Sequence, residues 1–262
     1  MHDHAFFAGP YPRAFVHRGW HFGDLEGMEN SLTAFRRAVA EGFYYLETDV
    51  HATADGVVVV HHDAVLDRTT DSCGAIARLP WQVVRTAKIG GREPVSRLEE
   101  VLEELPDALL NIDVKAERAI RPLLDTLRRT NAFGRVCVAS FSEARLERVR
   151  RDGPDGLLTS MGTKAIARLW AAGRLPRFVR ARRGYQRIAQ VPVRQGGLTV
   201  VDKRLISAAR RRGIEVHVWT IDDPGQMNEL IDLGVDGLMT DRPGVLRDVL
   251  RARGLWAAAL PE

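Results

Sequence analysis

Cysteine, lysine and aromatic residues are all scarce in this chain of 262 residues. The two cysteines, Cys73 and Cys137, lack a CxxC spacing and are too few for a disulfide-braced scaffold, which predicts a reducing compartment. Only four of the 38 basic side chains are lysines, so the formal net charge of +4 rests on arginine. This mild excess favours anionic partners but falls well short of the basic footprint of a nucleic-acid-binding protein.

Long hydrophobic runs are also missing. No stretch of about 18 uncharged apolar residues occurs, which excludes a helix that spans a membrane. The N-terminal segment MHDHAFFAGPYPRAF has no basic region followed by an apolar run of signal-peptide length. We therefore expect a cytoplasmic protein without a transmembrane segment.

Short runs rich in Val, Ile and Leu alternate with amphipathic segments along the chain. The expected strands are residues 13–17, 43–51, 57–61, 109–115, 135–140, 156–160, 188–191, 215–220 and 236–240. The expected helices are residues 30–41, 96–105, 118–130, 142–152, 162–173, 202–212, 224–233 and 243–253. This alternation is typical of a parallel sheet and favours a TIM (β/α)₈ barrel. A dinucleotide-binding fold is the weaker interpretation, because no GxGxxG follows the first strand.

Three segments depart from this alternation. Residues 43–62 are interpreted as a barrel strand that continues into a hairpin around an Asp55-Gly56 turn. Residues 63–95 show no clean period and are interpreted as a small insertion in a single domain covering residues 1–262. Residues 174–187 are basic with interspersed aromatic residues, which suits peripheral contact with a membrane. A loop or helix over the barrel end is favoured there, because proline and glycine interrupt the segment.

Acidic side chains stand near the ends of two expected strands. Because side chains alternate with a period of two, Glu47 and Asp49 share one face of their strand, and Asp113 shares a face with Lys115. In a barrel the carboxyl ends of the strands meet at one mouth, where three carboxylates would repel each other. A bound Mg²⁺ or Ca²⁺ ion would relieve that repulsion, and individual pairing with arginines is the alternative.

The hairpin predicts where a histidine lies. With a turn centred between Ala54 and Asp55, symmetric pairing of the two strands places His62 roughly opposite Glu47. His62 would then stand beside the carboxylates, and Asp63 would orient its ring.

A second histidine, His17, ends the first expected strand and faces the same mouth. Two histidines across a metal site suit general acid and general base roles, because their ordinary pKa lies near physiological pH. We interpret five other histidines as structural, namely His2, His4, His21, His51 and His61.

Fixed positive charges stand next to these groups in the sequence, at Arg18 and Lys115. A cation, an arginine and a lysine together suit a phosphoryl group, whose oxygens accept bidentate and point-charge donors. The residues therefore predict hydrolysis of a phosphate ester, with two histidines transferring protons and a metal stabilising the charge of the transition state.

Short motifs occur in a fixed order from about residue 13 to 250. They are His17-Arg18-Gly19, Glu29-Asn30-Ser31, Glu47-x-Asp49, Asp55-Gly56-(x)₅-His62-Asp63, Arg68-Thr69-Thr70, Asp113-x-Lys115, Ser140-Phe141, Trp219-Thr220 and Thr240-Asp241-Arg242-Pro243. In this order they resemble the glycerophosphodiester phosphodiesterase family, whose fold is a TIM barrel with a small insertion. The family usually carries Glu where this chain has Asp113, so that side chain is one methylene shorter.

The resemblance implies cleavage of a small-molecule glycerophosphodiester to sn-glycerol 3-phosphate and an alcohol, with Mg²⁺ or Ca²⁺ as cofactor. Carried over by position, the implied roles are metal ligation by Glu47, Asp49 and Asp113, proton transfer by His17 and His62, phosphate binding by Arg18 and Lys115, a pocket wall at Trp219, and support of the site by Glu29, Asn30 and Asp63.

Two rival interpretations stay open. A phospholipase D-like barrel enzyme acting on lysophospholipids would share the histidines and carboxylates, although such enzymes are typically secreted and braced by disulfides. A non-catalytic barrel that only binds glycerophosphodiesters would not require both histidines and the carboxylates.

Overall fold

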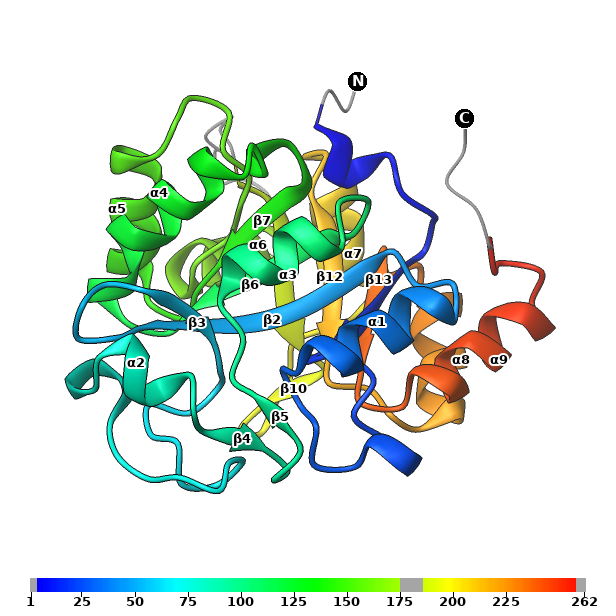
Figure 1. The fold of residues 1–262 in the computed structure, drawn as a ribbon. Coiled ribbons are helices and arrows are strands. Elements are labelled where there is room, and N and C mark those ends of the chain that lie inside the picture. The colour runs from blue at the N-terminus through cyan, green and yellow to red at the C-terminus, as the bar shows by residue number, and fades with distance from the viewer. Residues whose placement is uncertain (1–3, 175–185, 258–262) are drawn as a thin grey trace.

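The computed structural model describes residues 4–174 and 186–257, and within them parallel strands close into a barrel (Figure 1). Strand β1 pairs with both β2 and β13, which closes the ring through the order β1-β13-β12-β9-β8-β7-β6-β2. The barrel strands are β1 (Arg13–His17), β2 (Tyr45–Ala52), β6 (Leu109–Val114), β7 (Val136–Ala139), β8 (Thr159–Ser160), β9 (Gln186–Pro192), β12 (Glu215–Trp219) and β13 (Gly237–Thr240). The predicted (β/α)₈ barrel is confirmed.

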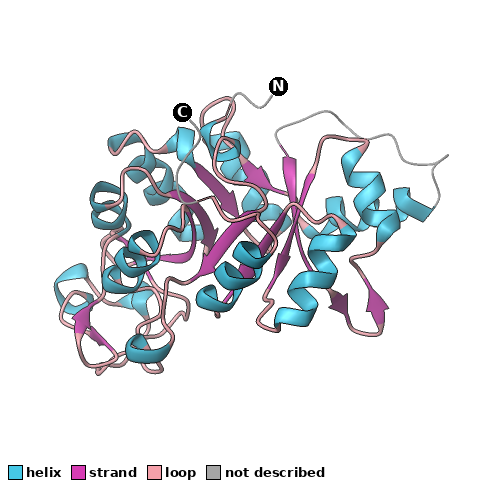
Figure 2. Cartoon of the chain, turned by 90° about the vertical axis from the view of Figure 1, so that its right-hand side faces the viewer, coloured by secondary structure: helices cyan, strands magenta, loops and turns pink. Residues whose placement is uncertain are grey.

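Helices alternate with these strands and surround the barrel (Figures 1 and 2). They are α1 (Leu32–Ala40), α3 (Leu98–Glu104), α4 (Ile120–Arg129), α5 (Glu143–Asp152), α6 (Thr163–Arg174), α7 (Lys203–Arg210), α8 (Pro224–Leu233) and α9 (Pro243–Ala252). Four begin where a side-chain oxygen accepts a hydrogen bond from a backbone N–H of the first turn, at Ser31, Ser142, Asp202 and Asp223. Each expected helix therefore has a counterpart in the structure.

The inside of the barrel is filled at one end by aromatic side chains. Phe6 and Phe7, from the short helix η1 (Ala5–Phe7), pack with Phe15 of β1 and Tyr45 of β2. The ring centroids of Phe15 and Tyr45 lie 4.9 Å apart. This inner cluster closes the end at which the strands begin, so the open space lies at the end where the strands finish.

Residues 63–95 lie outside the barrel ring and supply most of a small hydrophobic core, which Met28 and Val59 complete. They contain the helices η3 (Ile76–Arg78) and α2 (Trp81–Val84) and the two-stranded sheet β4 (Lys88–Ile89) with β5 (Glu93–Pro94). Leu66, Ile76 and Ile89 are fully buried in a cluster separate from those of the barrel. In Figures 1 and 2 this segment and the hairpin of β10 (Arg194–Gln195) with β11 (Leu198–Thr199) project from the same end of the barrel.

The predicted hairpin exists, but its register differs by one residue from the expected one. Strand β3 (Val58–Val60) pairs antiparallel with β2, and Val50 stands opposite Val60, so the turn is centred on Asp55. Gly56 adopts a left-handed φ of 82°, which accommodates the third residue of the loop. The pairing ends at Val60, so His62 is not opposite Glu47 and belongs to the loop that follows the strand.

The remaining short elements are the 3₁₀ helices η2 (Gly23–Leu25), η4 (Glu117–Ala119) and η5 (Phe133–Arg135). Most of the basic segment 174–187 lies outside the described residues, so its expected position over the barrel end stays a prediction. Among the helices of the described chain, none combines the length and apolar character that would let it cross a membrane.

Candidate active site

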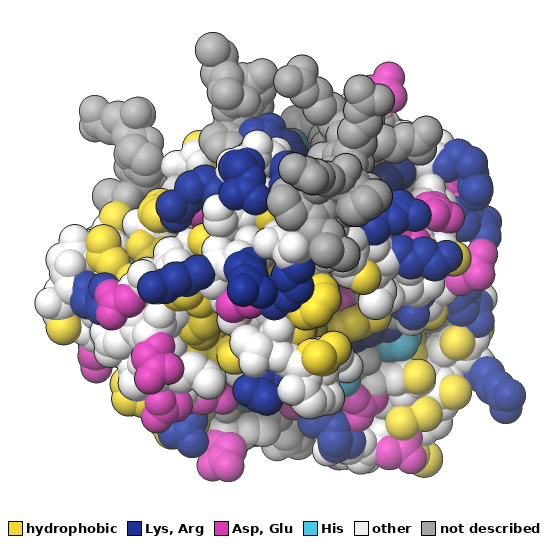
Figure 3. All heavy atoms as spheres, turned by 180° about the vertical axis from the view of Figure 1, so that it is seen from behind, with side chains coloured by type: hydrophobic (Ala, Val, Ile, Leu, Met, Phe, Trp, Pro, Cys, Tyr) yellow, Lys and Arg dark blue, Asp and Glu magenta, His cyan; other side chains and the backbone are white. Residues whose placement is uncertain are grey.

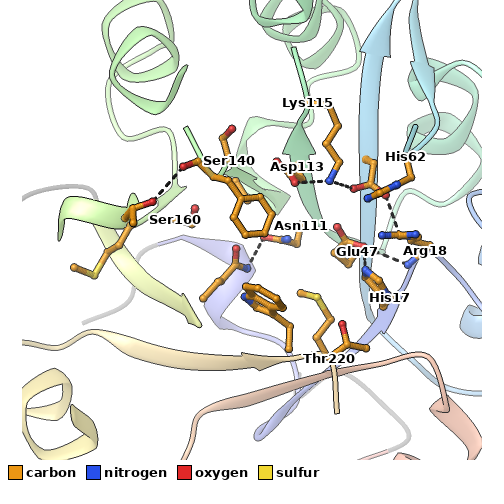
Figure 4. A pocket seen from close by; sticks show the side chains of 18 of the residues that line it. His17, Arg18, Glu47, His62, Asn111, Asp113, Lys115, Ser140, Ser160 and Thr220 are labelled. Carbon is orange, nitrogen blue, oxygen red and sulfur yellow. Dashed lines mark hydrogen bonds and ion pairs between the residues drawn. The ribbon is translucent and has the colours of Figure 1, made fainter. Parts of the chain in front are cut away.

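A cavity of about 220 Å³ opens where the barrel strands end (Figure 4). Its lining includes eight side chains that the sequence predicted for the site, namely His17, Arg18, Glu47, Asp49, His62, Asp113, Lys115 and Trp219. They come from β1 and the residue after it, β2, the loop after β3, β6 and the residue after it, and β12, so the closure of the barrel brings them together. Glu29, Asn30 and Asp63 do not line the cavity and lie behind those that do.

Three buried carboxylates stand on two neighbouring strands. Asp49 of β2 is paired in register with Asp113 of β6, and Glu47 stands two residues earlier on the same face of β2. All three side chains turn into the cavity, while Leu46 and Val50 point outward into the core between strands and helices. The alternation of the two strands therefore produces the carboxylate cluster.

Two cations contact this cluster. The Nζ atom of Lys115 lies 2.8 Å from Asp49 Oδ1 and 2.7 Å from Asp113 Oδ2, and Arg18 Nε lies 3.3 Å from Asp49 Oδ2. Burial alone would raise the pKa of Asp49, but the charges of Lys115 and Arg18 outweigh it and hold that pKa below its ordinary value. The alternative drawn from the sequence, in which arginines pair with the individual carboxylates, therefore holds in part, because Arg18 contacts Asp49.

The other two carboxylates are less well neutralised. Burial, followed by repulsion from Asp49, raises the pKa of Glu47 well above its ordinary value. Burial also raises the pKa of Asp113, whose Oδ1 atom is buried without a hydrogen-bond partner. A buried and unpartnered carboxylate oxygen is costly, so these atoms have unused capacity to bind a cation.

The donor set fits a hard divalent cation. Three carboxylates line one cavity, and all-oxygen ligation is what Mg²⁺ and Ca²⁺ prefer. Within residues 4–174 and 186–257, no three acidic, histidine or cysteine side chains are already drawn together as a metal cage. The ammonium of Lys115 supplies the positive charge between Asp49 and Asp113 instead.

His17 is held by Asp241, the residue that follows the last barrel strand. Its Nδ1 atom lies 2.6 Å from Asp241 Oδ1, and its Nε2 atom lies 3.7 Å from Glu47 Oε2. Burial opposes the charged ring, but Glu47 and Asp241 together raise the pKa of His17. Asp241 is strongly acidic: burial would raise its pKa, and the hydrogen bonds and charges of His17 and His21 lower it further than burial raises it.

His62 is held in the same way, by the aspartate that follows it in the loop after β3. Its Nδ1 atom lies 2.6 Å from Asp63 Oδ1, as the sequence predicted for Asp63. Arg68 binds both Asp63 and Glu29, with its Nε 2.6 Å from Asp63 Oδ2 and its Nη2 2.7 Å from Glu29 Oε1. The pKa of Asp63 is held far below its ordinary value, first by the hydrogen bond from Arg68.

Glu29 and Asn30 connect these groups to the carboxylates. Glu29 contacts Arg18 at 3.2 Å as well as Arg68, and its pKa is lowered, since the two arginines outweigh its burial. Asn30 donates from Nδ2 to Asp49 Oδ2 at 3.1 Å and accepts from Thr48 Oγ1 at 2.9 Å. Both residues therefore act as a frame behind the cavity.

Of the histidines interpreted as structural, those that the structure describes do not line the cavity, but one of them, His21, lies close to it. His61 turns away from the cavity and contacts the Asp63 carbonyl oxygen and Thr69 Oγ1, each at 2.9 Å. His51 contacts the carbonyl oxygen of His62, and His4 contacts that of Phe133, each at 3.1 Å. His21 is the exception in position, because its Nε2 lies 3.1 Å from the Asp241 oxygen that also contacts His17. His2 lies outside the described residues.

Sequence reasoning missed the roles of Asp241 and Arg68. Both residues stood in recognised motifs, and Asp241 followed a strand end, which was the only signal available. His17 precedes Asp241 by 224 residues, so no local pattern connects the two. Arg68 lies in a segment without regular periodicity. Sequence reasoning named Trp219 as a pocket wall but gave no role to Phe141, which packs edge-on against it with ring centroids 5.5 Å apart.

The fold and the cavity define a (β/α)₈-barrel enzyme whose site combines two aspartate-held histidines with clustered carboxylates and fixed cations. The model of the Glycerophosphoryl diester phosphodiesterase family matches residues 17–245. The chain is 41% identical over 248 residues to "Probable glycerophosphodiester phosphodiesterase 2" of Mycobacterium tuberculosis, covering 94% of this chain and 93% of that protein. The chain therefore belongs to the glycerophosphoryl diester phosphodiesterase family and is an enzyme of that class.

Solved structures share the barrel. A glycerophosphodiester phosphodiesterase from Agrobacterium tumefaciens is 24% identical with a TM-score of 0.72, over 91% of this chain and 99% of that one. An Oleispira antarctica phosphodiesterase, solved in complex with its product sn-glycerol-3-phosphate, is 21% identical with a TM-score of 0.74, over 92% and 97% of the two chains. At these identities the likeness establishes the fold.

Proposed function

We propose that the chain hydrolyses glycerophosphodiesters to sn-glycerol 3-phosphate and an alcohol. The observation that carries this proposal is the pair of histidines, each held by an aspartate at 2.6 Å, that line one cavity with carboxylates and cations. Such a cavity suits a reaction in which one group takes a proton while another gives one beside a phosphoryl group. The product complex of the Oleispira antarctica relative supports the same choice of product.

A divalent cation, Mg²⁺ or Ca²⁺, is the proposed cofactor, held by Glu47, Asp49 and Asp113. When bound, it would neutralise charge on the phosphoryl oxygens in the transition state. The buried, unpartnered Oδ1 atom of Asp113 and the raised pKa of Glu47 support this assignment. Arg18 and Lys115 line the same cavity and are proposed to hold the remaining phosphoryl oxygens, as fork and point-charge donors.

His17 and His62 are the proposed proton carriers. Each ring presents Nδ1 to an aspartate, so Nε2 is the atom left to exchange protons with the substrate. One ring takes a proton from the attacking water molecule as the water oxygen bonds to phosphorus. The other, protonated at Nε2, gives its proton to the alcohol oxygen as the bond from phosphorus to that oxygen breaks.

The proposed supporting residues act through these groups. Asp63 orients His62, while Glu29 and Asn30 fix Arg18 and Asp49. Trp219, at the end of β12, is proposed as a wall of the substrate pocket. We further propose that residues 1–262 act as one domain with residues 63–95 as an insertion, and that the protein is cytoplasmic.

Product analysis tests the proposal directly. The purified chain is incubated with glycerophosphocholine, glycerophosphoethanolamine or a lysophospholipid, with Mg²⁺, Ca²⁺ or excess EDTA, and followed by phosphorus NMR. We expect sn-glycerol 3-phosphate from the glycerophosphodiesters and no turnover in EDTA. Turnover of the lysophospholipid alone would favour the phospholipase D-like alternative. Binding without turnover would favour a non-catalytic barrel, and undiminished rates in EDTA would contradict the metal assignment.

A further inference from the structure

The cavity is divided by charge. Its charged side chains come from the first half of the barrel, from β1 to β6 and the loops that follow these strands. The other part is lined from β7, β8, α6, β9, β12 and β13, and none of the described lining residues there carries a charge. Seen from behind, hydrophobic side chains border a hollow with histidine side chains visible beside them (Figure 3). A substrate that spans the cavity therefore meets two different environments.

Two amide side chains join across the barrel at the boundary between these parts. Gln190 of β9 donates from Nε2 to Asn111 Oδ1 of β6 at 2.7 Å (Figure 4). Leu109 and Ile188 stand two residues before Asn111 and Gln190 on the same strands, and both belong to the inner apolar cluster. Because side chains on a strand repeat every two residues, the amide pair lies one layer above that cluster and forms the floor of the cavity.

The amide pair offers a donor and an acceptor to a ligand. Its internal hydrogen bond uses the carbonyl oxygen of Asn111 and one N–H of Gln190. That bond leaves the Asn111 amide N–H groups and the Gln190 carbonyl oxygen for other partners. A hydroxyl group both donates and accepts, so one hydroxyl, or two on adjacent carbons, matches this combination.

The surrounding walls are apolar and aromatic, which suits the carbon atoms of a substrate. Ile166, Met161 and the Phe141–Trp219 pair line the same part of the cavity, and Phe141 is 65% exposed at its edge. A positive charge already borders this part, because Lys115 Nζ lies 5.9 Å from the Phe141 ring centroid. None of the described lining residues in this part is a carboxylate.

We propose that Asn111 and Gln190 form the subsite that binds the hydroxyl groups of the glycerol end of the substrate. With the phosphoryl group held by Arg18 and Lys115, as the proposed function has it, the three glycerol carbons extend over the apolar walls and their hydroxyls meet the amide pair. The pair is then a specificity determinant: it selects glycerol phosphates over phosphates whose carbon chain lacks hydroxyls, because burying an unmatched amide is costly.

The test compares two ligands that differ only in hydroxyl groups. Affinities of sn-glycerol 3-phosphate and n-propyl phosphate are measured by calorimetry, in Mg²⁺, for the wild type and for Gln190→Met, which keeps the length of the side chain but removes its amide. Asn111→Ala provides a second variant that adds no apolar atoms beside Gln190. Gln195→Met, at an exposed glutamine of β10, is the matched control.

We expect the wild type and the control to bind glycerol 3-phosphate roughly 10- to 100-fold more tightly than propyl phosphate, as one or two hydrogen bonds provide. Gln190→Met and Asn111→Ala should lose most of that preference and keep their affinity for propyl phosphate. A preference retained in both variants, a preference missing from the wild type, or an equal loss of both ligands would overturn the proposal. Failure of the proposed function is separate, since it shows as a wild type that releases no glycerol 3-phosphate from any diester.

Discussion

Buried charges are paired at one end of the barrel interior and incompletely paired at the other end. Where the strands begin, Arg13 contacts Glu215 at 3.0 and 3.3 Å, and His217 contacts the same carboxylate at 3.0 Å. Where they end, Glu47 and Asp113 are buried with raised pKa values and incomplete pairing.

The difference separates stability from function within one set of strands. The paired end lowers the pKa of Glu215 to about 2, where burial alone would have raised it, because His217 and Arg13 stabilise the carboxylate. At the open end Lys115 and Arg18 neutralise only part of the carboxylate charge, so Glu47 and Asp113 stay incompletely paired. The paired charges at one end therefore stabilise the fold. The incompletely paired carboxylates at the other end remain available to a ligand.

The largest effect is expected at the histidines of the open end. Replacing His17 or His62 by Ala removes a proton carrier and should lower kcat about 10³-fold, within the range of general acid–base catalysis. His4→Gln, at the opposite end, is the control and should keep the wild-type rate. Steady-state kinetics on glycerophosphocholine measure this, and a double variant that still turns over at the wild-type rate would rule out the proton-transfer assignment.

A smaller loss is expected at the aspartate that holds His17. Asp241→Asn keeps the shape of the side chain but weakens its hold on Nδ1, and should lower kcat about 100-fold with little change in KM. Asp241→Glu should recover part of the rate. Equal changes in KM and kcat, measured in the same assay, would instead indicate a loss of binding.

A matched pair of substitutions tests the comparison itself by stability. Glu215→Gln leaves Arg13 buried without its charge partner and should lower the free energy of unfolding by about 3 kcal/mol. Glu47→Gln removes an incompletely paired charge, so it should change that free energy by less than about 1 kcal/mol while abolishing turnover. Urea unfolding provides both values, and equal destabilisation by the two changes would refute the contrast between the ends.

The smallest expected effect is a dependence of the free energy of unfolding on pH in the acid range. Because the pKa of Glu215 is about 2 when folded and 4.5 ordinarily, its stabilising contribution is complete above pH 4.5. It is lost as the pH falls from there toward about 2. Unfolding free energies measured along this range should fall more steeply for the wild type than for Glu215→Gln, and parallel curves would contradict the assigned ion pair.

The order of strands and helices could be predicted because it follows from the local periodicity of apolar residues. Each barrel strand carries its own apolar run, and the alternation in β2 and β6 places Glu47, Asp49 and Asp113 on inward faces before any contact is known. The hairpin register was wrong by one residue, because Gly56 admits a longer turn than symmetric pairing assumes.

What sequence could not reveal depends on closure of the ring. The contact of His17 with Asp241 requires β1 to lie beside β13, and that of Gln190 with Asn111 requires β9 to face β6 across the interior. Neither neighbour leaves a local pattern, since the residues are 224 and 79 positions apart. The role of Arg68 could not be predicted for another reason, because this residue lies in an irregular segment without periodicity.

The pairing of β1 with β13 also orders events during protein synthesis. His17 leaves the ribosome early, yet the carboxylate that fixes its ring belongs to Asp241, which follows the last strand. A nascent chain halted before β13 lacks one of the two neighbours of β1 and the carboxylate that contacts His17. The contact that holds His17 can therefore form only after nearly the whole chain has been synthesised.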